Sequence, residues 1–200
     1  MTFTRLFSSA AGARIAACII ASLLLTGCAA HSGARVTYHD PNMDFSLVRS
    51  VAVLPFVNLT NMAKAEDRVR DVFMTMLQAT GSVYVLPPGE VARGISRVGL
   101  ANPSAPTSED VVKLAKNLEA DVAITGTLLE YGEVRSTSAT ANVISVSVQM
   151  FEGGSGRVVW SASTTEGGIG AGKRLFGGGG EAMNVVTAKA VDQLLHRLFD

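Results

Sequence analysis

The sequence predicts an α/β fold: a mixed β-sheet flanked by helices, in a single compact domain with a C-terminal β-hairpin and helix. Residues 50–56 are apolar on both alternating faces, as expected of a central strand that is covered on both sides. Residues 144–150 alternate between apolar and polar side chains, which predicts a strand with one buried and one open face. Residues 63–80 carry apolar side chains at helical spacing, which predicts a helix that packs on this sheet.

Local patterns predict the remaining elements. Pro87 and Pro88 end a strand, Thr107 caps a helix, and the glycines within 153–156 turn the chain into a hairpin. These features predict strands at 35–38, 82–86, 121–134 and 157–164, and helices at 90–97, 107–118 and 181–199. A glycine-rich loop at 167–180 precedes the last helix.

Residues 1–27 have the three parts of a secretory signal. Arg5 and Arg14 supply the positive region, an apolar segment too short for an ordinary membrane span follows, and small residues precede Cys28. Leu25-Thr26-Gly27-Cys28 resembles the bacterial lipobox. This resemblance implies that the signal is cut before Cys28 and that Cys28 carries acyl chains such as palmitate. The alternative is a soluble secreted protein in which this cysteine occurs by chance.

The chain therefore divides into a signal peptide at 1–27, a lipidated tether at 28–47 and a folded domain at 48–200. Each buried acyl methylene contributes about 0.8 kcal/mol, so two or three chains hold a protein on a bilayer. An Asp directly after the lipidated cysteine is the usual signal for retention in the inner membrane. Ala29 stands there instead, which predicts a lipid anchor in the outer membrane with the domain on its periplasmic face.

Charge and cysteine content exclude several classes of protein. The chain has 17 Lys and Arg residues against 17 Asp and Glu residues, and no basic patch favours a nucleic-acid partner. Cys18 is removed with the signal and Cys28 is acylated, so the folded domain has no free thiol. Disulfides, cysteine catalysis and thiolate metal sites are therefore not expected.

The glycine-rich loop comes close to a phosphate-binding loop. In that motif a Ser or Thr after the lysine binds the magnesium ion, but here Arg174 follows Lys173. The loop also does not lead directly into a helix, so we expect no nucleotide. Leu175 and Phe176 are the apolar pair of this loop, and either cover the core or contact a membrane or partner.

No set of residues predicts catalysis, a cofactor or a metal site. His31 and His39 lie in the tether and His196 near the end of the last helix, each without a second ligand nearby in sequence. Glu130, Glu133 and Asp121 flank a strand, where carboxylates are usually solvated, and no serine has the context of a nucleophile elbow. We therefore predict a protein that is not an enzyme. Trp160 is either a core residue or a contact for a partner or the membrane.

The order of these motifs over about residues 48–199 resembles a group of periplasmic lipoprotein domains. The motifs are the strand 51–56 followed by Asn58 and Thr60, the segment 120–127, and the segment 156–161 with its tryptophan. The group includes CsgG, PelC, LpoB and the amino-terminal domain of TolB. Residues 135–141 form only a polar connection in place of the long hairpin insertions of CsgG, so a pore made by the protein itself is not expected.

The resemblance implies a role without catalysis. Members of the group assemble with copies of themselves or with machines of the cell envelope. The first expectation is a structural or assembly component of an envelope complex that exports polysaccharide or protein, working as a homo-oligomer or with an envelope protein partner. The alternative is a regulatory binding module that activates an enzyme of cell-wall synthesis.

Overall fold

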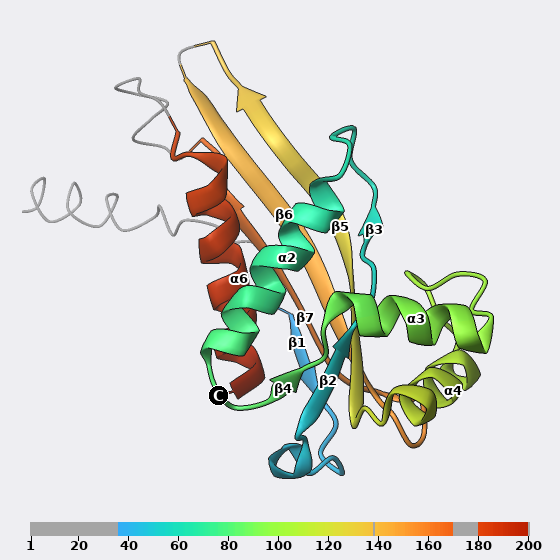
Figure 1. Cartoon of the computed structure of the whole chain (residues 1–200). Helices are drawn as coiled ribbons and strands as arrows, with labels where there is room; N and C mark the ends of the chain where they lie inside the picture. Colours follow the sequence, from blue (N-terminus) through green and yellow to red (C-terminus); the bar gives the residue numbers. More distant parts are fainter. Residues whose placement is uncertain (1–35, 138, 170–179, 200) are drawn as a thin grey trace, which may run out of the picture. The chain divides into compact units, whose positions relative to one another are not determined.

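A computed structural model describes residues 36–137, 139–169 and 180–199, all within one unit, Gly33–Asp200 (Figure 1). Seven strands form one sheet: β1 (Thr37–His39), β2 (Ser50–Val53), β3 (Val57–Asn58), β4 (Tyr84–Val85), β5 (Val122–Arg135), β6 (Thr140–Glu152) and β7 (Val158–Gly167). The helical elements are a 3-10 turn η2 (Phe45–Leu47) and the helices α2 (Ala65–Ala79), α3 (Pro88–Val98), α4 (Ser108–Leu118) and α6 (Met183–Phe199).

The sheet is mixed. Its strand order is β1-β7-β6-β5-β2-β4, and β3 pairs with β5 outside this path. The pairs β2–β4, β2–β5 and β3–β5 are parallel, whereas the pairs β1–β7, β6–β7 and β5–β6 are antiparallel. The predicted fold class is therefore confirmed, including the β6–β7 hairpin and the C-terminal helix.

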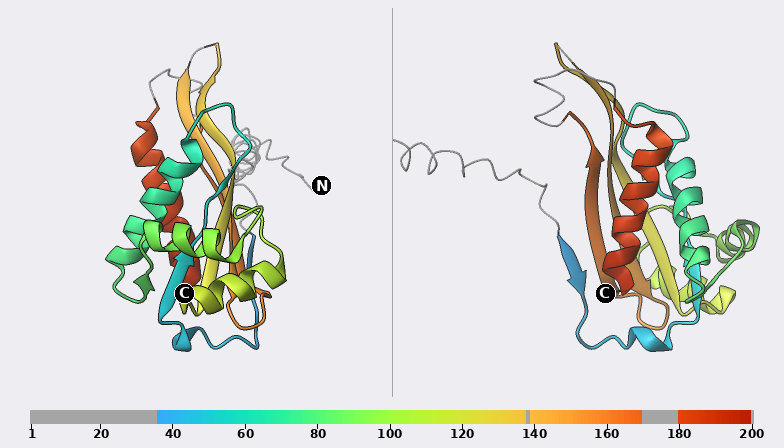
Figure 2. Two further views of the ribbon diagram at one scale, coloured as in Figure 1. Left: turned by 45° about the vertical axis from the view of Figure 1, so that its right-hand side comes forward. Right: turned by 90° about the vertical axis from the view of Figure 1, so that its left-hand side faces the viewer.

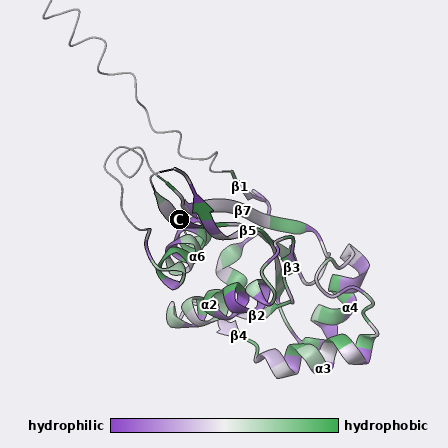
Figure 3. Cartoon of the chain, turned by 90° about the horizontal axis from the view of Figure 1, so that it is seen from above, coloured by the Kyte–Doolittle hydropathy of each residue, from purple (hydrophilic) through white to green (hydrophobic). Residues whose placement is uncertain are grey.

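Two apolar cores lie against the sheet, because β2 alternates between them. Val51 and Val53 belong to a core with α2 and α6, whereas Ala52 and Leu54 belong to a core with α3 and α4. Helices α2 and α6 lie side by side, as do α3 and α4 (Figures 2 and 3). The predicted central strand at 50–56 is thus covered on both faces, although it breaks at Pro55 before β3 resumes pairing with β5.

The first strand of the sheet, β1, lies close to the short strand predicted at 35–38. Strand β1 pairs with β7 inside the segment 28–47 that was expected to be a tether. Asp40 fixes this strand to the domain, because its backbone N–H donates to Val159 and its buried carboxylate pairs with Arg157 at 3.1 Å. The part of the chain from Thr37 onward therefore belongs to the fold.

The β5–β6 hairpin is longer than expected. Residues 135–141 were predicted to be a polar connection, but β5 runs to Arg135 and β6 starts at Thr140. Ala141 is buried, and the Asn142 side chain donates to the Glu181 carbonyl at 2.8 Å, so the approach to α6 covers the start of β6. The sequence did not predict this tertiary contact, because the side chains that form it are small or polar.

Asp121 ties the start of β2 to the start of β5. Its carboxylate accepts bonds from the backbone N–H groups of Arg49 and Ser50 at 2.8 and 2.9 Å, and from the Ser50 hydroxyl at 3.0 Å. Burial acts to raise the pKa of Asp121, but these hydrogen bonds and the nearby Arg49 charge outweigh it, so the pKa is lowered.

Asp121→Asn is expected to destabilise the domain at neutral pH more than at acid pH. A carboxylate with a lowered folded-state pKa stabilises the fold above its unfolded pKa of about 3.9, and this contribution is lost as the pH falls through the lower folded value. Urea unfolding at pH 7 and pH 3 measures the effect. A difference between wild type and variant that is equal at both pH values would contradict this account.

Gly156 is required where the β6–β7 turn meets α4. Its φ is +69°, and a Cβ there would lie 2.2 Å from the Ser108 carbonyl oxygen. Gly156→Ala should lower the free energy of unfolding by at least about 2 kcal/mol, because it combines left-handed backbone strain with a backbone clash. Gly154→Ala, where a Cβ would meet nothing within 4 Å, is the control for urea unfolding. Equal losses in both variants would exclude the clash as the cause.

Candidate interaction surfaces

The sheet has an uncharged open face on β6 and β7. Ile144, Val146 and Val148 are fully buried, as the alternating pattern predicted. The intervening residues pair across the strands as Ser145–Thr165, Ser147–Ser163 and Gln149–Ser161, and the Thr165 hydroxyl donates to Ser145 at 3.0 Å. This face presents hydroxyl and amide groups that form hydrogen bonds but carry no charge.

Trp160 lies in the core, so the expectation that it contacts a partner or the membrane is corrected. Its side chain is 0% exposed, and its indole N–H donates to the Arg197 carbonyl of α6 at 3.2 Å. The β6–β7 register sets Trp160 opposite Met150, on the buried face of the sheet. A single tryptophan on a strand gave no indication of which face it occupies.

The predicted lipidation site Cys28 and the apolar pair Leu175 and Phe176 lie outside the described residues, as does Lys173. The glycine-rich segment is anchored at both described ends beside Asn142, whose carbonyl accepts the Gly168 N–H at 2.8 Å and whose amide donates to Glu181. Contact of Leu175 and Phe176 with a partner or membrane remains a prediction.

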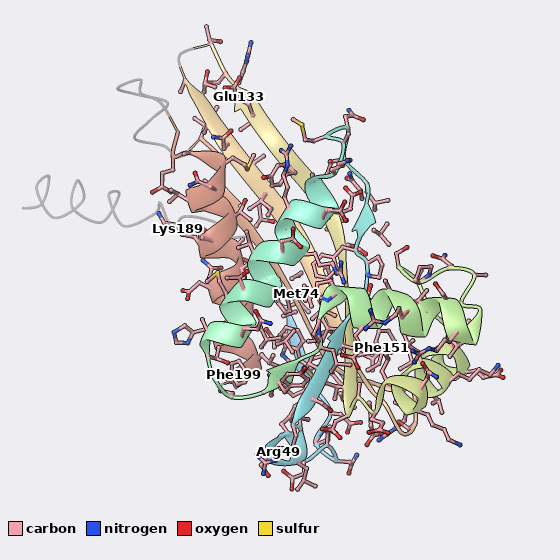
Figure 4. All side chains as sticks on the ribbon, in the orientation of Figure 1. Arg49, Met74, Glu133, Phe151, Lys189 and Phe199 are labelled. Carbon is pink, nitrogen blue, oxygen red and sulfur yellow. The ribbon has the colours of Figure 1, made fainter. Side chains whose placement is uncertain are left out.

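The polar residues considered for catalysis are not brought together. Glu133 pairs with Arg135 at 2.6 Å near the β5–β6 turn, and Asp121 holds β2 at the other end of the sheet. Figure 4 shows Glu133 and Arg49 at opposite ends of the domain. Among the described residues, no three His, Cys, Asp or Glu side chains are placed to hold a metal ion.

An apolar patch, formed by Leu59, Met62 and Leu129, was not found from the sequence. These side chains are 62%, 45% and 45% exposed. The Leu59 N–H donates to the Leu128 carbonyl at 2.9 Å, and the β5 ladder shifts register between Leu128 and Glu130, where Leu129 is the extra residue. Bulges of this kind redirect a side chain. Here the redirected side chain is Leu129, which lies beside the loop that carries Leu59 and Met62.

Asn58 holds that loop in place. Its side-chain oxygen Oδ1 accepts from the Thr60 backbone N–H at 2.9 Å and from the Thr60 hydroxyl at 2.8 Å. Its side-chain Nδ2 group donates to the Met62 carbonyl and to the Glu66 carboxylate. The loop thus presents its apolar side chains from a fixed backbone. The sequence had marked Asn58 and Thr60 as part of a family motif but not for this structural role.

A second apolar surface, the base cleft, lies at the C-terminal ends of α2 and α6. It combines a cavity of about 60 Å³ with a more open groove of about 390 Å³, and Phe199 lines both. Phe45, Val48, Leu77, Val83 and Leu198 also line the cavity. The groove is also lined by Met76, Ala79, Thr80, Asp192, Leu195 and His196. Phe199 is 47% exposed and lies at the end of α6 (Figure 4).

Comparison with known proteins places this fold in a family. The GNA1162-like lipoprotein family model matches residues 41–200. The chain belongs to the GNA1162-like lipoprotein family. No curated protein matches the sequence. Membership in this family confirms the lipoprotein group suggested by the order of sequence motifs.

Solved structures share the GNA1162-like fold. A PelC dodecamer from Paraburkholderia phytofirmans is similar with a TM-score of 0.57 and 18% identity, over 83% of this chain and 97% of that one. Lipoprotein GNA1162 from Neisseria meningitidis is similar with a TM-score of 0.54 and 16% identity, over 76% and 98% of the two chains. These likenesses establish the fold. In the part of the chain that the structure describes, no helix is long and apolar enough to cross a membrane.

Proposed function

We propose that this protein is an outer-membrane lipoprotein, anchored through Cys28, that serves as a structural component in the assembly of an envelope export complex. Its periplasmic domain works as a homo-oligomer and performs no catalysis. Membership in the GNA1162-like lipoprotein family carries the proposal. The fold shared with PelC, whose structure is a dodecamer, supports self-assembly.

The described surfaces agree with a role in assembly. The apolar patch and the base cleft expose large apolar side chains, which mark interaction sites on folded domains. The open sheet face offers hydrogen-bonding groups for a polar partner. A polysaccharide or a protein substrate is the proposed cargo class of the complex.

The location is tested by separating the inner and outer membranes of cells that produce the full chain. Wild type should sediment with the outer membrane. Ala29→Asp should shift the protein to the inner membrane, because it introduces the residue usual in retained lipoproteins. Wild type in the inner membrane would contradict the proposed location.

The role is tested in cells that lack the protein. Export of the polysaccharide or protein cargo to the cell surface should fail, while the rate of cell-wall synthesis, measured by incorporation of a labelled precursor, should stay unchanged. Normal export with slowed incorporation would instead favour the alternative, a module that activates a cell-wall enzyme.

We also propose that Leu175 and Phe176 contact a partner or the bilayer. Replacing both with Ser should leave the melting temperature within about 2 °C of wild type, because surface substitutions change stability little. The same change should weaken assembly or membrane association. A melting temperature lower by many degrees, with assembly intact, would instead make them core residues.

A further inference from the structure

We propose that copies of this protein join head to tail, with the apolar patch of one copy seated in the base cleft of the next. The patch is Leu59, Met62 and Leu129, and the cleft is the apolar hollow at the ends of α2 and α6. The proposal rests on the homo-oligomeric function proposed above and names the two surfaces that meet.

The patch is exposed and its loop is held in place by hydrogen bonds. Asn58 fixes the backbone of its loop, so the backbone of Leu59 and Met62 loses little freedom when a partner covers them. Leu129 adds a third apolar side chain from the bulge in β5. An exposed apolar group of this kind can bury its surface in an apolar hollow.

The base cleft is the matching concave surface. Its cavity is lined by aliphatic and aromatic side chains, which give water few hydrogen-bond partners. An apolar side chain that enters the cavity releases this unfavourable solvation and gains contact with walls such as Phe45, Val83 and Phe199.

One pair of opposite charges favours a second copy as the occupant. Lys64 is exposed next to the patch, and Asp192 is exposed in the lining of the groove. Within the described residues, neither side chain has an ion-pair partner in its own chain. Seating the patch in the cleft of the next copy brings these opposite charges to the same interface.

The placement of the two surfaces makes the contact head to tail. The patch lies near the first turn of α2 and the cleft near its last turn, and 15 helical residues span about 22 Å. The two surfaces are therefore too far apart to meet within one copy. When two copies join in this way, one copy keeps a free cleft and the other keeps a free patch, so further copies can be added. Such contacts build closed rings or open filaments.

Cysteine cross-linking of the full lipidated chain in detergent tests the contact. The mature protein should have no free thiol, so wild type should form no cross-links. Oxidation of the double variant Leu59→Cys with Ala79→Cys should give a ladder of dimers, trimers and larger species, and each single variant should give none. Ala92→Cys with Ala79→Cys is the control, because Ala92 is exposed on α3, away from the patch.

A charge exchange gives a second, independent test. Lys64→Glu should weaken self-association roughly tenfold, since it replaces an attraction with a repulsion, and adding Asp192→Lys should restore it. Thermal melts of each variant verify that the domain still folds. An intact oligomer without a ladder, or without response to the charge exchange, would overturn the proposed contact while the proposed function stands. A monomeric wild type would overturn both.

Discussion

Val148→Asp is expected to unfold the domain, whereas Ser147→Asp leaves it folded. Val148 is fully buried on β6 between β5 and β7, facing the core that α2 and α6 cover. An isolated carboxylate there would cost several kcal/mol, against a total stability of about 5–15 kcal/mol for a typical domain. Ser147 lies on the open face, where water can solvate the same charge.

Circular dichroism melts of the two variants distinguish these outcomes, because the neighbouring positions carry the same substitution. Val148→Asp should be unfolded already and show no cooperative transition on heating. Ser147→Asp should have a melting temperature within about 5 °C of wild type, as expected of a surface change. Equal loss of structure in both variants would mean that the open face is covered in the folded protein.

Cys28→Ser is expected to abolish membrane association completely. A serine hydroxyl does not accept the diacylglyceryl group in this reaction, so the protein should remain uncleaved or become soluble. The acyl chains supply the anchor, at about 0.8 kcal/mol per methylene, and the described domain has no helix to replace them.

Intact mass and membrane fractionation measure this result. Cys18→Ser is the matched control, because it changes a cysteine within the predicted signal and should leave lipidation unaffected. A Cys28→Ser protein that still carries lipid would exclude the proposed anchor.

The sequence predicted those elements whose apolar periodicity reflects local packing. The alternation of β6, the stripe of α2 and the cap of α4 at Thr107 were all found, the last with a full capping box between Thr107 and Asp110. Strand β3 was missed because its two residues are too short for a period to show. The length of the β5–β6 hairpin was missed because its covered positions are alanines.

The interaction surfaces were harder to predict because they depend on tertiary contacts. The base cleft is formed where η2, β2, α2 and α6 converge, and no sequence pattern places Phe45 beside Phe199. The apolar patch depends on a bulge that turns Leu129 outward. Trp160 could be assigned to the core only once its register against Met150 was known.

The mass of the full lipidated protein in detergent, measured by light scattering after subtraction of bound detergent, tests the central claim most directly. Self-assembly predicts a mass of several copies of the mature chain that persists on dilution into the low micromolar range. The mass of one copy at every concentration would contradict self-assembly. It would instead favour the alternative hypothesis, a regulatory module that activates a cell-wall enzyme.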